Sequence, residues 1–286
     1  VTAFSAMITP LIPPGIALIL YGSIANVSVG KLFMAGLAIG AMLCVSEMVM
    51  VHFISKKRGY VPIRTEHVSR REGFHALKEA ALPLCLPVII IGGIRIGVFT
   101  PTEAGSVAIL YALLLGFFYR EMSLADFFRS VRETITTTSS IIIIIGAASA
   151  YSWILTKEQV PQMLAETILS MIDSKYLFLI IVNLLLLVVG MFVEGNVSMI
   201  VLVLVPIARA YGIDDIQFAV MFIFNSAIGD LTPPFGTLMF VSCGATKCNM
   251  RDFVREGIPF YLMLLVWLIL LTYFPLFSTG IVNLLY

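Results

Sequence analysis

Long apolar runs, separated by short polar stretches, make up most of this chain. The runs that predict membrane segments are residues 3–25, 31–54, 80–94, 104–118, 134–155, 176–193, 216–245 and 258–285. A helix needs about 20 apolar residues to cross a bilayer. Lipid offers no partner to an open sheet edge, and no ten-residue segments of alternating polarity occur. We therefore expect an all-α polytopic membrane protein with six to eight full spans.

The polar stretches between the runs predict orientation and connections. The densest basic cluster lies in the loop of residues 56–72, so the positive-inside rule places this loop in the cytoplasm. Residues 73–79 predict an amphipathic lead-in at the membrane interface, and residues 120–132 predict a polar amphipathic link. The run that follows the lead-in has expected weak points at Pro83 and Pro87, because proline disrupts helical hydrogen bonding.

Two apolar runs are interrupted by adjacent prolines. The first break contains Pro13-Pro14-Gly15, and the second contains Pro233-Pro234-Phe235-Gly236. A proline inside a helix removes a hydrogen bond and clashes with the preceding turn, at a cost of about 3 kcal/mol or more. We expect both helices to unwind there, which leaves backbone groups that need partners inside the membrane.

This recurrence is an internal repeat, and paired broken helices indicate a secondary transporter. In that design, unwound carbonyl groups bind a cation and the N-termini of the half-helices face an anionic substrate. The alternative is that each proline pair only kinks a packed helix. The glycine near both pairs, at Gly15 and Gly236, favours a binding site.

A short apolar run beside a polar tip predicts a re-entrant hairpin. Residues 197–208 are too few to span a bilayer, and they follow the polar residues 194–196. This tip precedes Pro233 by 37 residues (233 − 196). By the repeat, a partner tip should precede Pro13 by a similar distance, at a point before Val1. We therefore expect the intact gene product to be longer at its N-terminus.

Composition narrows the class of function further. Of the 286 residues, 59% are hydrophobic and 12% are charged, whereas soluble domains carry about 25% charged residues. The net charge of +1 provides no basic field for nucleic acid, so no nucleic-acid partner is expected. The cysteines have no zinc-site spacing and are interpreted as inert thiols; they are Cys44, Cys85, Cys243 and Cys248.

Three motifs, in order, resemble the large M subunit of TRAP transporters, the tripartite ATP-independent periplasmic carriers. They are LIPPGIALILYG at 11–22, GGIRIGVFTPTEAGSVAILY at 92–111 and IGDLTPPFGTLMF at 228–240. The resemblance covers essentially the whole chain and implies that the N-terminal part of such a subunit is absent here. The sequence departs from the family pattern at Thr9, commonly glycine, at Gly15, commonly serine, and at Asp230, more often apolar.

The resemblance implies an elevator mechanism driven by sodium ions in the bacterial inner membrane. It implies two protein partners, a periplasmic substrate-binding protein and a small four-helix membrane subunit, besides the lipid bilayer. Residues 1–28 and 176–245 would form the transport domain, as the first broken helix and the second hairpin with its broken helix. Residues 29–175 would be scaffold and connecting helices, and residues 246–286 a C-terminal scaffold helix.

The resemblance also implies binding residues. One sodium site is expected between the hairpin tip and the second break, with ligands Gly195, Asn196, Ser198, Gly229, Thr232, Gly236 and Thr237. A second is expected near residues 12–15, with further ligands from the absent hairpin. The substrate carboxylate is expected near Pro14, Gly15, Ser198 and Gly236. Sialic acid, another sugar acid or a C4-dicarboxylate would fit, and the sequence does not choose among them.

Charged residues near the membrane define further hypotheses. A carboxylate at membrane depth costs several kcal/mol unless it is partnered. Asp230 would tune sodium affinity, pair with a cation on the partner hairpin, or reach water in the substrate cavity. Within the Thr100-Pro101-Thr102-Glu103 motif, we expect Glu103 to cap the following helix. Arg95 would pair with Glu103, extend to the headgroups or hold a substrate carboxylate.

Two rival classes fit the sequence less well. A membrane enzyme needs a nucleophile and base, or paired acids, at membrane depth. The three histidines, His52, His67 and His75, instead flank one loop. A channel needs a continuous polar pore, whereas two inequivalent broken helices suit an occluded site. We therefore expect a carrier that is not an enzyme, with proton coupling as the alternative to sodium.

Overall fold

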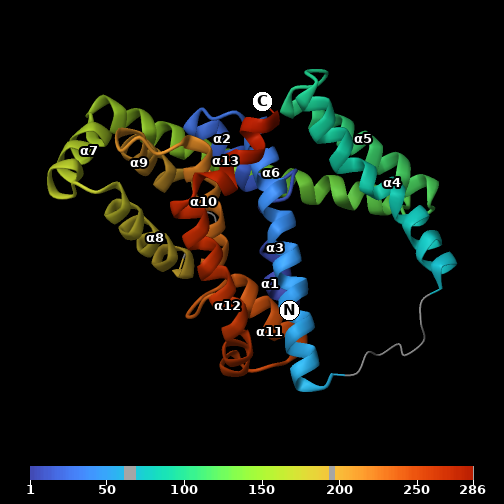
Figure 1. Cartoon of the computed structure of the whole chain (residues 1–286). Coiled ribbons are helices and arrows are strands. Elements are labelled where there is room, and N and C mark those ends of the chain that lie inside the picture. The colour runs from blue at the N-terminus through green and yellow to red at the C-terminus, as the bar shows by residue number, and fades with distance from the viewer. Residues whose placement is uncertain (61–68, 193–196, 286) are drawn as a thin grey trace. The chain divides into compact units, whose positions relative to one another are not determined.

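The computed structural model describes residues 1–60, 69–192 and 197–285, and these ranges are helical almost throughout (Figure 1). No strand occurs in them, so the all-α prediction is confirmed. The helices are α1 (Thr2–Ala6), α2 (Ile16–Ala25), α3 (Val29–Arg58), α4 (Arg70–Arg95), α5 (Pro101–Phe118), α6 (Leu124–Lys157), α7 (Val160–Met171), α8 (Lys175–Phe192), α9 (Val197–Ala210), α10 (Asp215–Gly229), α11 (Thr237–Thr246), α12 (Met250–Tyr273) and α13 (Pro275–Leu285).

The chain divides into two compact units. Residues Val1–Lys57 and Tyr151–Tyr286 form the first, and Arg58–Ala150 form the second. Both predicted breaks fall in the first unit, and the Thr100–Glu103 motif falls in the second. The predicted division into transport and scaffold parts stays a prediction, because compactness does not report which helices move together.

Four helices in the described ranges are long and apolar enough to cross a membrane, namely α3, α4, α5 and α12. This is fewer than the six to eight full spans that the apolar runs predicted. Part of the difference lies in the breaks, which divide runs 3–25 and 216–245 into shorter helices. A helix of 14 residues such as α9 is about 21 Å long, as expected for a segment too short to span.

The amphipathic link predicted at 120–132 lies mostly in α6, which runs on without a break. Two other sequence predictions are wrong in detail. The helix α4 continues through Pro83 and Pro87, which were expected to weaken it. The predicted single C-terminal helix is two helices, because α12 ends at Tyr273 and α13 begins at Pro275, where proline is favoured in the first helical turn.

The internal repeat extends beyond the proline pairs. Residues 7–15 separate α1 from α2, and residues 230–236 separate α10 from α11. The helix that follows each break, α2 or α11, is called here its second arm. Each second arm has ten residues, begins after a glycine and ends at a residue with left-handed backbone, Asn26 or Lys247. A long helix follows each arm after three residues, α3 in the first repeat and α12 in the second.

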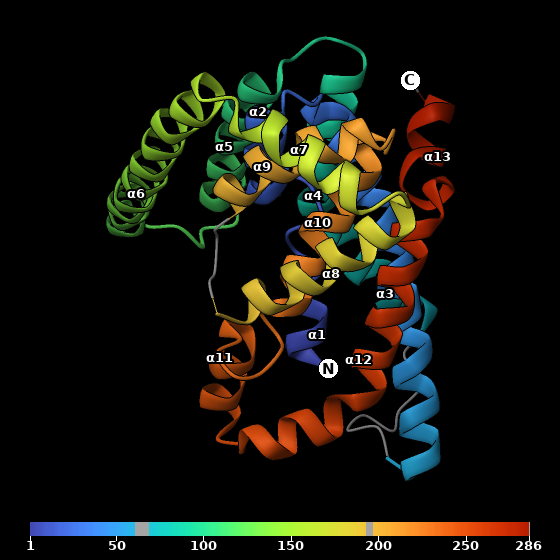
Figure 2. The same ribbon diagram turned by 90° about the vertical axis from the view of Figure 1, so that its left-hand side faces the viewer.

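Packing in the first unit is centred on α10. Apart from Ser226, its residues from Gln217 to Gly229 are buried. The helices α8, α9 and α12 pack against α10, and α9 also packs against α2, as Figure 2 shows for α8, α9 and α2. Arg209 near the end of α9 donates a 2.8 Å hydrogen bond to the carbonyl of Ala25, at the end of α2. The segment after the predicted hairpin tip therefore contacts the broken helix of the first repeat.

Candidate functional site

Both breaks interrupt their helices as the proline pairs predicted. The Pro13–Pro14 and Pro233–Pro234 peptide bonds are both cis. Within the described ranges, no backbone N–H donates to the carbonyl oxygens of residues 9–14 or 232–234. Each break therefore presents a short run of main-chain oxygens that lack a helical partner.

Glycine is required where each break turns into its second arm. A Cβ atom on Gly15 would lie 2.3 Å from the carbonyl oxygen of Pro10, and one on Gly236 would lie 2.6 Å from that of Asp230. A third glycine, Gly36 of α3, lies so close to the first break that its Cβ would be 2.2 Å from the oxygen of Leu11. The chain thus folds back tightly at both breaks, and α3 supports the first one.

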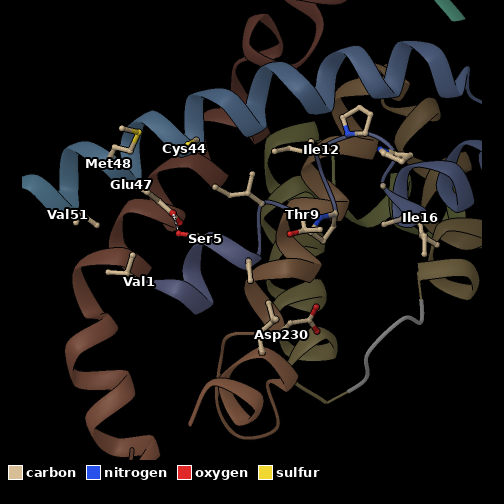
Figure 3. A pocket seen from close by; sticks show the side chains of 18 residues that line it. Val1, Ser5, Thr9, Ile12, Ile16, Cys44, Glu47, Met48, Val51 and Asp230 are labelled. Atoms are coloured by element: carbon tan, nitrogen blue, oxygen red, sulfur yellow. Dashed lines mark hydrogen bonds between the residues drawn. The ribbon is translucent and has the colours of Figure 1, made fainter. Parts of the chain in front are cut away.

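A cavity of about 1100 Å³ lies against the first break (Figure 3). Its wall includes Thr9 and Pro13 to Gly15 from the break, Ser5 of α1 and Glu47 of α3. Asp230, which caps the end of α10, is also on this wall. The cavity therefore brings Pro14 and Gly15, predicted to bind substrate, to the same space as Asp230.

The other predicted ligands do not line this cavity. Thr232 in the second break donates its hydroxyl to the carbonyl of Ile228 at 2.7 Å, which leaves acceptor lone pairs on its Oγ1. Thr237 is the first residue of α11, directly after Gly236. Among the residues that the structure describes, none of Gly229, Thr232, Gly236 and Thr237 is on the cavity wall. Gly195 and Asn196, and the side chain of Ser198, lie outside the described part of the chain.

Gly229 instead marks the closest approach of α10 to α8. A Cβ on Gly229 would lie 2.6 Å from both Cα and C of Gly190. Small residues allow helix backbones to approach in this way. Sequence reasoning did not single out Gly190, because one glycine near the end of an apolar run does not show which helix it will meet. The contact holds α8, the helix before the predicted tip, against the second break.

A network of polar side chains connects α8, α10 and α12. The Asn225 side chain donates to the Oδ1 of Asn183 in α8 at 2.6 Å, and Asn183 donates to the hydroxyl of Thr272 in α12 at 2.9 Å. Gln217 donates to the carbonyl of Thr272 at 2.7 Å. Buried polar groups need such partners, so these bonds favour one arrangement of α8, α10 and α12. The Oδ1 of Asn225 is buried and accepts no hydrogen bond from the described residues.

The Thr100–Glu103 motif forms a capping box at the start of α5. The Thr100 side chain accepts from the Glu103 amide, and the Glu103 carboxylate accepts from both the amide and the hydroxyl of Thr100, each at 2.8 Å. The predicted capping role of Glu103 is confirmed. Thr102 lies in the first turn of α5. No ion pair joins Arg95 to Glu103 in the part of the chain that the structure describes.

Glu47 is a residue of the cavity that the sequence predictions missed. It is only 5% exposed, and its Oε2 accepts a 2.7 Å hydrogen bond from the Ser5 hydroxyl. Its other oxygen is buried and has no hydrogen-bond partner among the described residues. The available signal was an acid in the middle of the apolar run 31–54, since acids within membrane segments are rare and functional by default.

Comparison with known proteins identifies the family. The family model described as the DctM component of the tripartite ATP-independent periplasmic transporter matches residues 1–277. The chain belongs to this DctM family. It is a family of transporter components rather than enzymes, as the sequence predicted. With four apolar helices of spanning length among its described residues, this DctM chain is a multi-pass membrane protein.

Curated DctM relatives match nearly the whole chain. The sialic acid TRAP transporter large permease protein SiaM of Vibrio cholerae is 43% identical over 280 residues, which cover 97% of this chain and 65% of that protein. The sialic acid TRAP transporter permease protein SiaT of Haemophilus influenzae is 37% identical over 100% of this chain and 46% of its own length. The 2,3-diketo-L-gulonate TRAP transporter large permease protein YiaN of Escherichia coli is 36% identical, with coverages of 96% and 64%. The chain thus spans about half to two thirds of these relatives.

Proposed function

We propose that this chain is the translocating part of a sodium-driven carrier for a small organic acid in the bacterial inner membrane. The observation that carries the proposal is the pair of breaks, each with main-chain oxygens that accept no backbone hydrogen bond from the described residues. Oxygens of this kind bind alkali cations in carriers with broken helices. Membership of the DctM family supports transport as the function.

The proposed substrate is a sialic acid or a related sugar acid. Two of the relatives described above are named for sialic acid and one for a diketo sugar acid. The cavity beside Pro14 and Gly15 has room for such a molecule, since ligand pockets typically measure about 300–1000 Å³. A C4-dicarboxylate is the competing substrate, and the two classes are separated by competition for uptake.

We place the sodium ligands in the second break and the hairpin tip. Gly229, Gly236 and the tip residues Gly195 and Asn196 would contribute carbonyl or amide oxygens, and Thr232 and Thr237 would contribute hydroxyls, with Ser198 shared between ion and substrate. The N-terminus of α2 would face the substrate carboxylate, since that end of a helix is electropositive. A periplasmic binding protein would deliver the acid, and a small membrane subunit would hold the scaffold while the transport domain moves.

Uptake into proteoliposomes tests the proposal. The full-length subunit is reconstituted with its small subunit and binding protein, and labelled acid is followed with and without an imposed sodium gradient. We expect accumulation only with the gradient. Thr232→Val combined with Thr237→Val should abolish sodium-dependent uptake, because two hydroxyl oxygens are replaced by methyl groups.

Thr167→Val is the matched control for this double variant. Its hydroxyl also donates to the carbonyl four residues earlier, at 2.8 Å, but from the exposed surface of α7. The control should transport normally. Uptake by the double variant with unchanged sodium dependence would remove these threonines from the site. Accumulation driven by a pH gradient alone would replace sodium by protons as the coupling ion.

A further inference from the structure

We propose that Glu47 is a proton-binding site in the wall of the cavity, and that it holds its proton at neutral pH. The site lies in α3, within a segment long and apolar enough to cross a membrane. Figure 3 shows the Glu47 carboxyl on the cavity side of α3, joined to Ser5 of α1. This inference concerns a bound proton and does not depend on which acid is transported.

The carboxyl group is both buried and incompletely paired. Glu47 is 5% exposed, and Ser5 satisfies only one of its two oxygens. Glu47 takes part in none of the ion pairs seen among the described residues, such as His75–Glu79 and Arg209–Asp215. An unpaired carboxylate in such surroundings is strongly disfavoured. Its charge must therefore be removed by a proton or balanced by a bound cation.

The neighbouring groups favour the proton. The titratable groups that share the cavity wall with Glu47 are the side chains of Cys44 and Asp230 and the amino group of Val1. The helix α12 contacts α3, since Trp267 donates a hydrogen bond to Ser46. The acids of α12 near its start, Asp252 and Glu256, line a separate hollow together with Val1 and Phe4. No side chain in either set is basic, so apart from the Val1 amino group these sets hold no cation that could balance a carboxylate.

Glu47 has too few neighbouring oxygen ligands to favour a metal cation over a proton. The Ser5 hydroxyl is the described group that hydrogen-bonds Glu47, and no cluster of three or more acidic, histidine or cysteine side chains occurs among the described residues, whereas hard cations take about six oxygen ligands. A proton needs only the buried oxygen that has no partner. Because Ser5 donates to Oε2 and Oε1 has no hydrogen-bond partner among the described residues, the proton is expected on Oε1.

A neutral Glu47 has a consequence for the organic acid. Asp230 already places one carboxyl on the cavity wall, and a second negative charge would repel an anionic ligand. The proton on Glu47 keeps this part of the wall uncharged. Resting on the proposed function, this predicts that acid binding weakens when the pH is high enough to ionise Glu47.

Infrared titration tests the proton site directly and without transport. The full-length subunit is purified with its partner subunit, and the carbonyl absorption of protonated carboxyl groups is recorded from about pH 4 to about pH 9. Labelling glutamate carboxyls with ¹³C separates Glu47 from Asp230. An exposed glutamate loses its proton near pH 4.3, as a rough reference, so a glutamate band that persists at pH 7 is diagnostic.

We expect this band in the wild type and its loss in Glu47→Gln. Ser5→Ala should shift the band, because the hydrogen bond to the carboxyl is removed. Glu79→Gln, at an exposed glutamate of α4, is the matched control and should leave it unchanged. If Glu47→Gln does not fold, Glu47→Asp takes its place. The carboxyl at position 47 is then an aspartate, so its band should no longer shift when glutamate carboxyls are labelled with ¹³C. The proposal is overturned if the glutamate band at pH 7 is the same in wild type as in whichever variant of Glu47 folds.

Discussion

Replacing Gly229 with alanine would make a methyl group clash with the backbone of α8. The added Cβ would lie 2.6 Å from Cα and C of Gly190 and 3.0 Å from its oxygen, whereas carbon atoms in contact are about 3.5–4.0 Å apart. These neighbours are backbone atoms, so relief requires α8 and α10 to separate. Overpacking costs about 1–3 kcal/mol, and a backbone clash belongs at the upper end. About 3 kcal/mol corresponds to roughly a hundredfold change in an equilibrium constant.

The same substitution on the facing helix, Gly190→Ala, should destabilise the protein less. A Cβ on Gly190 would lie 3.1 Å from Cα of Gly229 and 3.3 Å from the oxygen of Ser226, which shifts of a few tenths of an ångström would relieve. We expect Gly190→Ala to cost about 1 kcal/mol or less, partly offset by the better helix propensity of alanine. The control is Gly244→Ala in α11, where the Cβ would meet nothing within 4 Å.

Thermal unfolding of the purified variants in detergent measures this order. We expect Gly244→Ala to be at least as stable as wild type, Gly190→Ala slightly less stable and Gly229→Ala clearly the least stable. Equal stability of Gly229→Ala and wild type would refute the close packing of α8 on α10. So would a larger loss for Gly190→Ala than for Gly229→Ala.

Three further predictions follow from single contacts. Arg209→Ala should lower thermal stability by about 1 kcal/mol, because a half-exposed charged hydrogen bond to the Ala25 carbonyl is lost; an unchanged melting curve would contradict the α2–α9 contact. Trp267→Phe should cost about 1 kcal/mol, because its indole N–H donates to Ser46 at 3.0 Å; Trp267→Ala should cost more. With the other cysteines replaced by serine, Cys44 should react with a water-soluble maleimide, and bound acid should slow the reaction, because its thiol lines the cavity.

Local chemistry explains what the sequence predicted well. Adjacent prolines cannot continue a helix, so both breaks were predictable from Pro13-Pro14 and Pro233-Pro234 alone. The capping box was equally local, since Thr100 and Glu103 are three residues apart and bond to each other's backbone. Signals of this kind depend on a few neighbouring residues and not on which helices later meet.

Features that depend on tertiary packing were not predictable. Pro83 and Pro275 both interrupt apolar runs, but α4 continues through the first and a new helix begins at the second. The contact of Gly190 with Gly229 joins residues on different helices, and no sequence pattern pairs them. Glu47 was visible as an acid in an apolar run, but its bond to Ser5 required knowing that α1 packs beside α3.

The two breaks are proposed to bind an ion and an organic acid. A density map of the full-length subunit with its partners, loaded with sodium and substrate, would locate both ligands. We predict an ion held by main-chain oxygens of a break, and the acid in the cavity beside Pro14 and Gly15. A map in which ion and acid are both bound elsewhere, and residues 9–14 and 232–236 contact only apolar neighbours, would show that the breaks are not the binding site.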